Sequence, residues 1–180
     1  LRSAREREST VFIFGNGGSA AAASHFATDL AKDRFGDKRY LFKVMSLVDN
    51  TPLITATAND YGYEEIFLRQ LKLYLKPDDL VIAISSSGNS ENVIRATSFA
   101  RESGAKTWGI VGFSGGKLAE TAEQSVYIPT SVGQYGFMED VTSILIHMVT
   151  VHIYEQDRKI LSAENSRTEE TIQPCSEKQY

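Results

Sequence analysis

Cysteine is almost absent from the 180-residue chain, which has a single thiol at Cys175. One cysteine cannot form a disulfide within the chain, and this fits the reducing cytoplasm. No apolar stretch is long enough to span a membrane, and the charged residues 1–9 do not resemble the apolar core of a signal peptide. We therefore expect a cytoplasmic protein without a membrane partner. Because the chain begins with Leu1 rather than Met, we also expect a trimmed or processed N-terminus.

An excess of positive charge is also missing. The chain has 19 Lys and Arg against 23 Asp and Glu, for a net charge of −4. This net charge does not indicate a basic surface of the kind that binds nucleic acid, and we expect no direct nucleic-acid partner. Nucleotide-binding loops are missing too, because residues 15–19 (GNGGS) match neither GxGxxG nor GxxxxGK[ST]. A nucleotide cofactor is therefore not expected.

The composition is that of one compact domain, since 42% of the 180 residues are hydrophobic and can form a core. Apolar runs alternate with segments of helical spacing, which indicates an α/β fold with a parallel sheet and helices on both faces. We expect strands at 11–14, 41–47, 80–85, 107–111 and 126–129, a less regular apolar segment at 53–58, a turn at 59–63, and helices at 20–30, 64–75, from 91, after 117 and at 137–154. We predict an arm or helix end at residues 1–10, one domain at 11–157 and a polar, disordered tail at 158–180.

Residues 80–95 (LVIAISSSGNSENVIR) lead from an apolar strand through a serine-rich loop into a helix. A helix start offers unpaired N–H groups and the positive end of the helix dipole, and both attract phosphate. Ser90 alone could be explained as a helix cap. Capping does not need four serines in six residues, so the loop predicts a phosphate site.

A similar strand–loop–helix pattern occurs at residues 11–30, which makes a faint internal repeat with residues 81–100. Both loops are expected at the carboxyl edge of the sheet, where open α/β sheets bind ligands. The glycines of residues 15–19 allow either close approach of a small ligand or simply a tight turn. Asn59 and Asp60 are typical of a turn, but at the same edge they could also hydrogen-bond sugar hydroxyls.

Two acid–histidine pairs lie on predicted helices. His25 and Asp29 are four residues apart and share one helix face. Glu139 and His147 lie along one ridge of the long helix, where polar groups are costly to bury without partners. The four side chains are of the types found in zinc sites and in acid–base pairs. His25 and Asp29 alone would also suit an ordinary helix surface, and Glu139 and His147 could merely form interface hydrogen bonds. His152 lies off this ridge, and we expect it to be structural or exposed.

Together these segments resemble the SIS (sugar isomerase) domain family and, within it, the phosphoheptose isomerases. The resemblance extends from about residue 11 to residue 154. The matching motifs are residues 15–19 with 25–27, residues 58–63 (ANDYGY), residues 84–90 (ISSSGNS) and residues 115–119 (GGKLA). The family implies a three-layer, flavodoxin- or Rossmann-like α/β sandwich with five parallel strands. It also implies homo-oligomers, tetramers or dimers, with active sites at subunit interfaces.

The resemblance further implies isomerisation of sedoheptulose 7-phosphate to D-glycero-D-manno-heptose 7-phosphate through an enediol, often with zinc. The implied phosphate ligands are Ser85, Ser86, Ser87 and Ser90. The implied sugar-binding residues are Asn16, Gly17, Gly18, Ser19, Asn59, Asp60 and Glu139. The implied metal ligands are His25, Asp29, Glu139 and His147. Asp29 is the candidate base, and His147 is its acid–base partner.

The sequence departs from the family pattern on the first and the last helix. Asp29 replaces a glutamate, Glu139 replaces a glutamine, and Thr142 stands where a further family histidine would fall. The loop before Glu139 also looks one residue longer. These changes keep a metal site, with more negative charge than usual.

A non-enzymatic role is the alternative to isomerisation. Some relatives bind partner proteins, including one that assists a replication initiator, and such a homologue can lose the acid on the first helix. A phosphosugar-sensing module would need the serine loop alone. Retention of both Asp29 and His147 favours the enzyme. Because the helix at 137–154 is apolar around much of its circumference, we also expect a homo-oligomer that packs through it.

Overall fold

The computed structural model describes residues 1–172 as an α/β fold around one sheet. Five parallel strands lie in the order β2-β1-β3-β4-β5, which confirms the predicted sheet. In chain order the elements are α1 (Arg2–Glu6), β1 (Thr10–Gly15), α2 (Gly18–Ala31), η1 (Lys38–Tyr40), β2 (Lys43–Ser46), α3 (Thr51–Tyr61), η2 (Tyr63–Glu65), α4 (Leu68–Tyr74), β3 (Leu80–Ser85), α5 (Glu91–Glu102), β4 (Lys106–Val111), α6 (Gly116–Thr121), β5 (Gln124–Tyr127) and α7 (Tyr135–Ile172).

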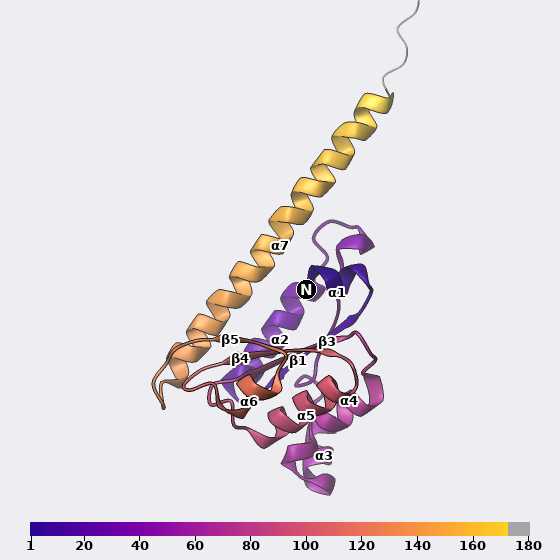
Figure 1. Cartoon of the computed structure of the whole chain (residues 1–180). Helices are drawn as coiled ribbons and strands as arrows, with labels where there is room; N and C mark the ends of the chain where they lie inside the picture. Colours follow the sequence, from indigo (N-terminus) through magenta and orange to yellow (C-terminus); the bar gives the residue numbers. More distant parts are fainter. Residues whose placement is uncertain (173–180) are drawn as a thin grey trace, which may run out of the picture.

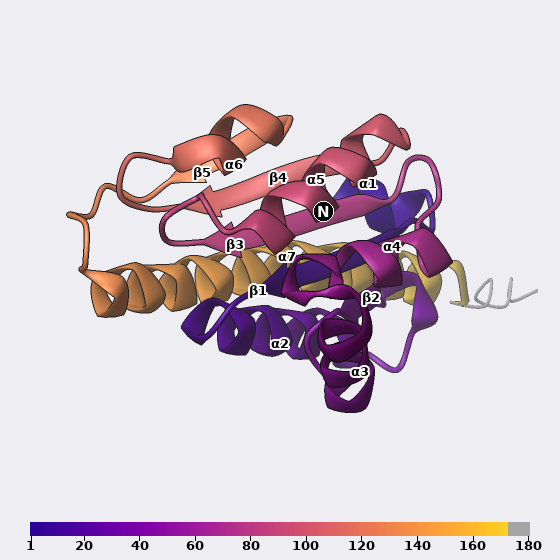
Figure 2. The same cartoon turned by 90° about the horizontal axis from the view of Figure 1, so that it is seen from below.

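The helices form a layer on each face of the sheet, as the two views show (Figures 1 and 2). Helices α2 and α7 pack together on one face, and α4, α5 and α6 cover the other. The position of strand β1 in the sheet explains why residues 11–14 are all apolar. Val11 and Ile13 enter the core under α2 and α7, whereas Phe12 and Phe14 enter the core on the opposite face. This is the expected pattern for a central strand buried on both sides.

The last helix corrects the predicted start of a polar tail at residue 158. Helix α7 continues to Ile172 and projects beyond the body of the protein (Figure 1). Residues 158–167 are mostly exposed, so their polarity reflects contact with solvent and not the end of the helix. No glycine or proline occurs between residues 137 and 172, and an Arg158–Glu155 ion pair of 2.7 Å supports the extension. Residues 173–180 of the predicted tail, with Cys175, lie outside the described residues.

The apolar segment at residues 53–58 is the middle of a helix, α3, and not a further strand. The Asn50 side chain accepts a hydrogen bond from the N–H of Leu53 and so caps the helix start. Pro52 lies in the first turn, where a missing N–H does no harm. The turn predicted at residues 59–63 begins only at Gly62, whose φ of +103° ends the helix.

The N-terminal segment, predicted as an arm or a helix end, contains α1 and is joined to the domain. Arg5 makes two hydrogen bonds, of 2.6 and 2.7 Å, to the buried carboxylate of Asp157 on α7. Such a bidentate pair fixes both partners in position. Among residues 1–172, no helix has the length and apolar character needed to cross a membrane.

Candidate functional site

The serine loop (residues 85–90) connects the carboxyl end of β3 to the start of α5. Because β3 is the central strand of the sheet, Ser85 and Ser86 are buried, with exposed fractions of 5% and 7%. The Ser85 hydroxyl accepts a hydrogen bond from the N–H of Gly88 at 3.1 Å. Ser90 precedes α5, but its side chain makes no cap hydrogen bond. Its hydroxyl therefore remains available for a ligand.

Residues 115–118, at the start of α6, contact the serine loop and fix its backbone. Gly88 has a φ of +66°, and a Cβ at this position would overlap the carbonyl oxygen of Gly115. The N–H of Leu118 donates to the carbonyl of Gly88 at 2.8 Å, and the N–H of Lys117 donates to Asn89 Oδ1 at 3.1 Å. These contacts require glycine where the two backbones meet. They fix the serine loop without using the hydroxyl of Ser90.

A polar cavity of about 250 Å³ opens between the serine loop and the glycine loop (residues 15–19); we call it the serine pocket. The first turn of α5 brings unpaired N–H groups to this edge of the sheet, which is a general anion-binding arrangement. The lining residues are Asn16, Gly17, Gly18, Ser19, Ile84, Ser85, Ser86, Ser87, Ser90, Tyr135 and Glu139.

Glu139 enters the serine pocket from α7 and lies directly against α2. A Cβ at Gly18 would overlap its carboxylate. Gly17 precedes α2 with a φ of +56°, so the chain turns sharply at this point. The glycines therefore allow both the turn and the close approach of a carboxylate.

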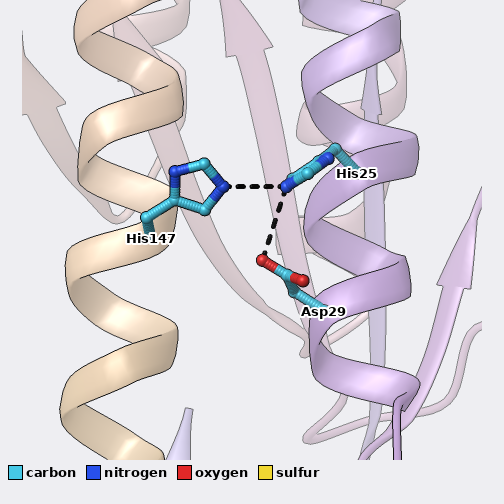
Figure 3. A group of neighbouring side chains, drawn as sticks. All are labelled: His25, Asp29 and His147. Carbon is cyan, nitrogen blue, oxygen red and sulfur yellow. Dashed lines mark hydrogen bonds and ion pairs between the residues drawn. The ribbon is translucent and has the colours of Figure 1, made fainter.

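His25, Asp29 and His147 form a second cluster, the imidazole group, between α2 and α7 (Figure 3). The Nε2 atoms of His25 and His147 are 2.9 Å apart. His25 Nε2 is also 3.5 Å from Asp29 Oδ2, four residues further along α2. The side chain of His25 is 54% exposed, whereas that of Asp29 is 19% exposed. The prediction that His25 and His147 meet across more than a hundred residues is therefore confirmed.

The geometry of the imidazole group suits a divalent metal. Its ligand atoms all lie within 4.8 Å of one another. In a tetrahedral zinc site with Zn–N bonds of 2.0–2.1 Å, neighbouring ligand atoms are about 3.3 Å apart. The separations of 2.9 and 3.5 Å lie on either side of this value. Two imidazoles and one carboxylate would leave a fourth position open for substrate, as in catalytic zinc sites.

Tyr154 joins α7 to α2 and lies about two turns beyond His147 on α7. Its hydroxyl donates to the carbonyl of Asp29, and the Arg34 guanidinium lies 3.8 Å from the centre of its ring. Burial raises the pKa of the Tyr154 hydroxyl above its usual value. The hydroxyl therefore stays protonated and keeps donating at neutral pH.

A family model described as SIS domain matches residues 1–112, which is more than half of the chain. The chain belongs to the SIS domain family. Among curated SIS relatives, the probable phosphoheptose isomerase of Thermoplasma volcanium is 41% identical over 145 residues, covering 79% of this chain and 69% of that protein. The probable phosphoheptose isomerase of Thermoplasma acidophilum is 36% identical over 156 residues, covering 87% and 84% of the two chains.

Solved structures of the SIS family agree with the fold. The phosphoheptose isomerase from Neisseria gonorrhoeae is 28% identical and superimposes with a TM-score of 0.76, over 86% of this chain and 80% of that one. The enzyme from Francisella tularensis is 27% identical, with the same TM-score, over 85% and 80% of the two chains. The predicted SIS architecture is therefore confirmed.

Two sets of predicted site residues lie elsewhere. Glu139 is not part of the imidazole group; it is eight residues before His147, about 12 Å along the helix axis, and lines the serine pocket. The predicted convergence of four metal ligands is thus wrong for Glu139. Asn59 and Asp60 are exposed in the last turn of α3, where the Asn59 amide donates to Asp60 Oδ1 at 2.8 Å. Neither lines the serine pocket.

Three residues of the site were not identified from the sequence. Tyr135 lines the serine pocket at the start of α7. Tyr63 and Asn92 hydrogen-bond the side chain of Asn16. Tyr63 is the last residue of the 58–63 motif (ANDYGY) and Asn92 lies two residues after the serine loop, so both had a sequence signal, whereas Tyr135 had none. Thr142, at the place of a further family histidine, is buried and bonds the Met138 carbonyl at 2.7 Å, so it faces away from the site.

Proposed function

We propose that this chain isomerises a ketose phosphate to an aldose phosphate, with sedoheptulose 7-phosphate as the substrate and D-glycero-D-manno-heptose 7-phosphate as the product. The observation that carries the proposal is the presence of an anion pocket and a His–Asp–His group along the same two helices, α2 and α7. Relatives named phosphoheptose isomerase support the substrate class. The chain covers 69% of the first and 84% of the second.

The phosphate would occupy the serine pocket. Ser87 and Ser90 supply hydroxyls at its edge, and the start of α5 supplies N–H groups and the positive end of a dipole. None of the eleven lining residues carries a positive charge. Neutral donors would therefore hold the dianion, so binding should depend only weakly on salt compared with an Arg or Lys site.

The spacing between the pocket and the imidazole group favours a long sugar. Gly18 and His25 are seven residues apart on α2, about 10 Å along the axis. An extended chain of single bonds advances by about 1.2 Å per bond. The C2 carbonyl of a 7-phosphate then lies about 8 Å from phosphorus, against about 6 Å for a 5-phosphate. The longer ketose is better able to reach from the serine loop to the imidazole group.

The reaction would proceed by proton transfer. Asp29, as base, takes the proton from C1 of the ketose, next to the C2 carbonyl, and an enediol forms as the carbonyl oxygen gains a proton. His147 gives and accepts protons at the two oxygens. Return of the proton at C2 gives the aldose, so no oxidant or reductant is consumed. A divalent metal, when held by His25 Nε2, His147 Nε2 and one oxygen of Asp29, would polarise the carbonyl oxygen in place of the proton from His147. The second Asp29 oxygen would remain free to act as the base.

Proton exchange with solvent is the direct test of this route. The purified protein is incubated with sedoheptulose 7-phosphate in D₂O and followed by NMR. We expect aldose to appear with deuterium at C2, because the abstracted proton exchanges with water in an enediol mechanism. A panel of seven-, six- and five-carbon ketose phosphates should favour the longest. Phosphosugar binding without any turnover or exchange would instead indicate the sensing module.

Zinc is the metal we propose for the imidazole group, on the ligand types and spacing given above. Since zinc would bind the folded state preferentially, zinc at 100 times its Kd should stabilise the protein by about 2.7 kcal/mol. The midpoint of thermal unfolding, measured with zinc and with a chelator, should shift in wild type but not in His25→Ala. The exposed His152 is a matched control, and His152→Ala should respond like wild type. An equal response in His25→Ala would place the metal elsewhere.

We also propose a homo-oligomer, a tetramer or a dimer, formed through an apolar stripe on α7. Phe137, Val141, Ile144, Met148 and Val151 are 66%, 37%, 57%, 65% and 55% exposed. Their alternating spacing of four and three residues is that of a helix–helix seam. Light scattering should give a multiple of the 19.9 kDa chain mass. A charge in the stripe, Ile144→Asp, should lower this mass, whereas a charge at the exposed loop residue Val132 should not.

A further inference from the structure

Two asparagine side chains join the glycine loop to the start of α5. Asn16 Nδ2 donates to Asn92 Oδ1 at 2.9 Å, and Asn92 Nδ2 donates back to Asn16 Oδ1 at 2.8 Å. The Tyr63 hydroxyl adds a third hydrogen bond, also to Asn16 Oδ1, at 3.0 Å. Asn92 is only 2% exposed. A buried amide pair of this kind is highly directional, because an amide that is turned over loses both bonds.

A backbone N–H group fixes the orientation of the two side-chain amides. The N–H of Val93 donates to Asn92 Oδ1 at 3.0 Å, in addition to the carbonyl of Ser90. Turning the Asn92 amide over would place its NH₂ against this N–H. The oxygen of Asn92 therefore faces Val93, its nitrogen faces Asn16, and Asn16 must present the complementary edge.

Only one hydrogen-bonding group of the Asn16 amide is left over. Its oxygen accepts from Asn92 and from Tyr63, so both lone pairs are in use. One of its two N–H bonds points to Asn92. Among the described residues, the other N–H has no partner, and Asn16 lines the serine pocket. The hydrogen-bonding group that Asn16 can still offer to a ligand in the pocket is therefore a donor and not an acceptor.

We propose that Asn92 and Tyr63 are positioning residues that hold Asn16 with one amide N–H directed at an oxygen of the bound sugar phosphate. This inference rests on the proposed function of the pocket. Neither positioning residue needs to touch the reacting carbons. Tyr63 belongs to η2 and Asn92 to α5, so the network also joins two separate segments to the glycine loop.

The test separates sugar recognition from phosphate binding by using two probes, sedoheptulose 7-phosphate and inorganic phosphate. Tyr63→Phe removes one hydroxyl, and the ring is 55% exposed, so the fold should survive. Without the Tyr63 hydrogen bond, Asn16 is held by Asn92 alone and its free N–H is aimed less firmly. The Kd and KM for the sugar phosphate should then rise about threefold to tenfold, the range of one neutral hydrogen bond. The Kd for inorganic phosphate and kcat should stay unchanged. Tyr74→Phe, at a tyrosine that is 47% exposed, is the matched control.

Asn92→Ala gives a second and stronger measurement. It should raise the Kd for the sugar phosphate further, and adding Tyr63→Phe should then have little extra effect, because both act through Asn16. Equal losses for both probes would mean that the network merely supports the serine loop, and would overturn the inference. An unchanged sugar phosphate Kd in Tyr63→Phe would overturn it as well. A wild-type protein that neither binds nor converts the sugar phosphate would overturn the proposed function, and with it the inference.

Discussion

The serine pocket and the imidazole group lie along the same two helices but are built in opposite ways. The serine pocket is made by loops at the carboxyl edge of the central strands, and Ser85 and Ser86 are buried. Its donors are backbone N–H groups and short hydroxyl side chains. The imidazole group consists of longer side chains in the middle of α2 and α7, and both His25 and His147 are exposed.

This difference predicts how each region responds to change. A pocket fixed by strand ends and glycine contacts is preorganised, and it should bind anions even when the helices above it shift. The imidazole group depends on the relative position of α2 and α7, so a small displacement would separate its atoms. Mutations should therefore be able to weaken phosphate binding and catalysis separately.

The largest expected effect comes from removing an acid–base group while the phosphate site stays intact. Asp29→Asn and His147→Ala should each lower kcat by about 10²–10⁴-fold, the usual contribution of a general acid or base. The Kd for sedoheptulose 7-phosphate, measured by calorimetry, should change little, because the phosphate site is separate. Asp140→Asn and His152→Ala alter exposed residues on α7 and are the matched controls. Full turnover by Asp29→Asn would remove Asp29 as the base but leave the site in place.

Removing hydroxyl groups from the serine pocket should have the next largest effect. Ser87→Ala and Ser90→Ala should each weaken sugar phosphate binding by about 1.5–3 kcal/mol, the value of a hydrogen bond to a charged group. The midpoint of thermal unfolding should stay near that of wild type in Ser90→Ala, since Ser90 makes no cap bond. It should fall slightly in Ser87→Ala, because the Ser87 hydroxyl accepts a hydrogen bond from the Asn89 N–H at 3.2 Å. Ser98→Ala, an alteration in the body of α5, controls for loss of a serine on that helix. Unchanged calorimetric affinity in both variants would disprove the phosphate assignment.

Gly18→Ala tests the contact between the start of α2 and Glu139 of α7 inside the serine pocket. The new Cβ would overlap the Glu139 carboxylate, the end of a flexible side chain, so the carboxylate would rotate away while the fold stays intact. We expect weaker sugar phosphate binding, measured by calorimetry, although alanine itself favours a helix. Glu139→Ala in the same chain removes the overlap, so the double variant should bind better than Gly18→Ala alone. Additive losses would mean that Glu139 and Gly18 act independently.

The sequence was sufficient for the parts of the molecule that are continuous in it. The runs at residues 11–14 and 80–84 are buried on both faces, which gives an apolar residue at every position and a clear strand pattern. The serine loop follows one of these strands directly. In contrast, residues 53–58 are apolar without a clear period, and the capping role of Asn50 decides for a helix.

The remaining differences depend on tertiary structure. Periodicity correctly placed His25 and Asp29 on one face, and His147 on the facing helix, but it could not tell how far along α7 the contact with α2 extends. Eight residues bring Glu139 to a similar direction and yet about 12 Å away from His147, so it falls in the other region. The link from Tyr63 to Asn16 joins residues 47 apart and leaves no local pattern.

The smallest expected effect concerns the hydrogen bond by which Tyr154 joins α7 to α2. Its hydroxyl bond to the Asp29 carbonyl should contribute about 0.5–1.5 kcal/mol, which Tyr154→Phe would remove at pH 7. Burial raises the pKa of this hydroxyl above the usual value of 10.0, so the folded state holds the proton more tightly than the unfolded state. The contribution is therefore fully present below pH 10 and is lost as the pH rises through the folded-state pKa. Urea unfolding of wild type and Tyr154→Phe should show a difference in the free energy of unfolding at pH 7 that narrows above pH 10, with Tyr74→Phe as the control.

Because the Tyr154 bond aligns the imidazole group and not the serine pocket, Tyr154→Phe should also lower kcat modestly without changing phosphate affinity. A loss of phosphate affinity equal to the loss of kcat would mean that the two regions move as one unit.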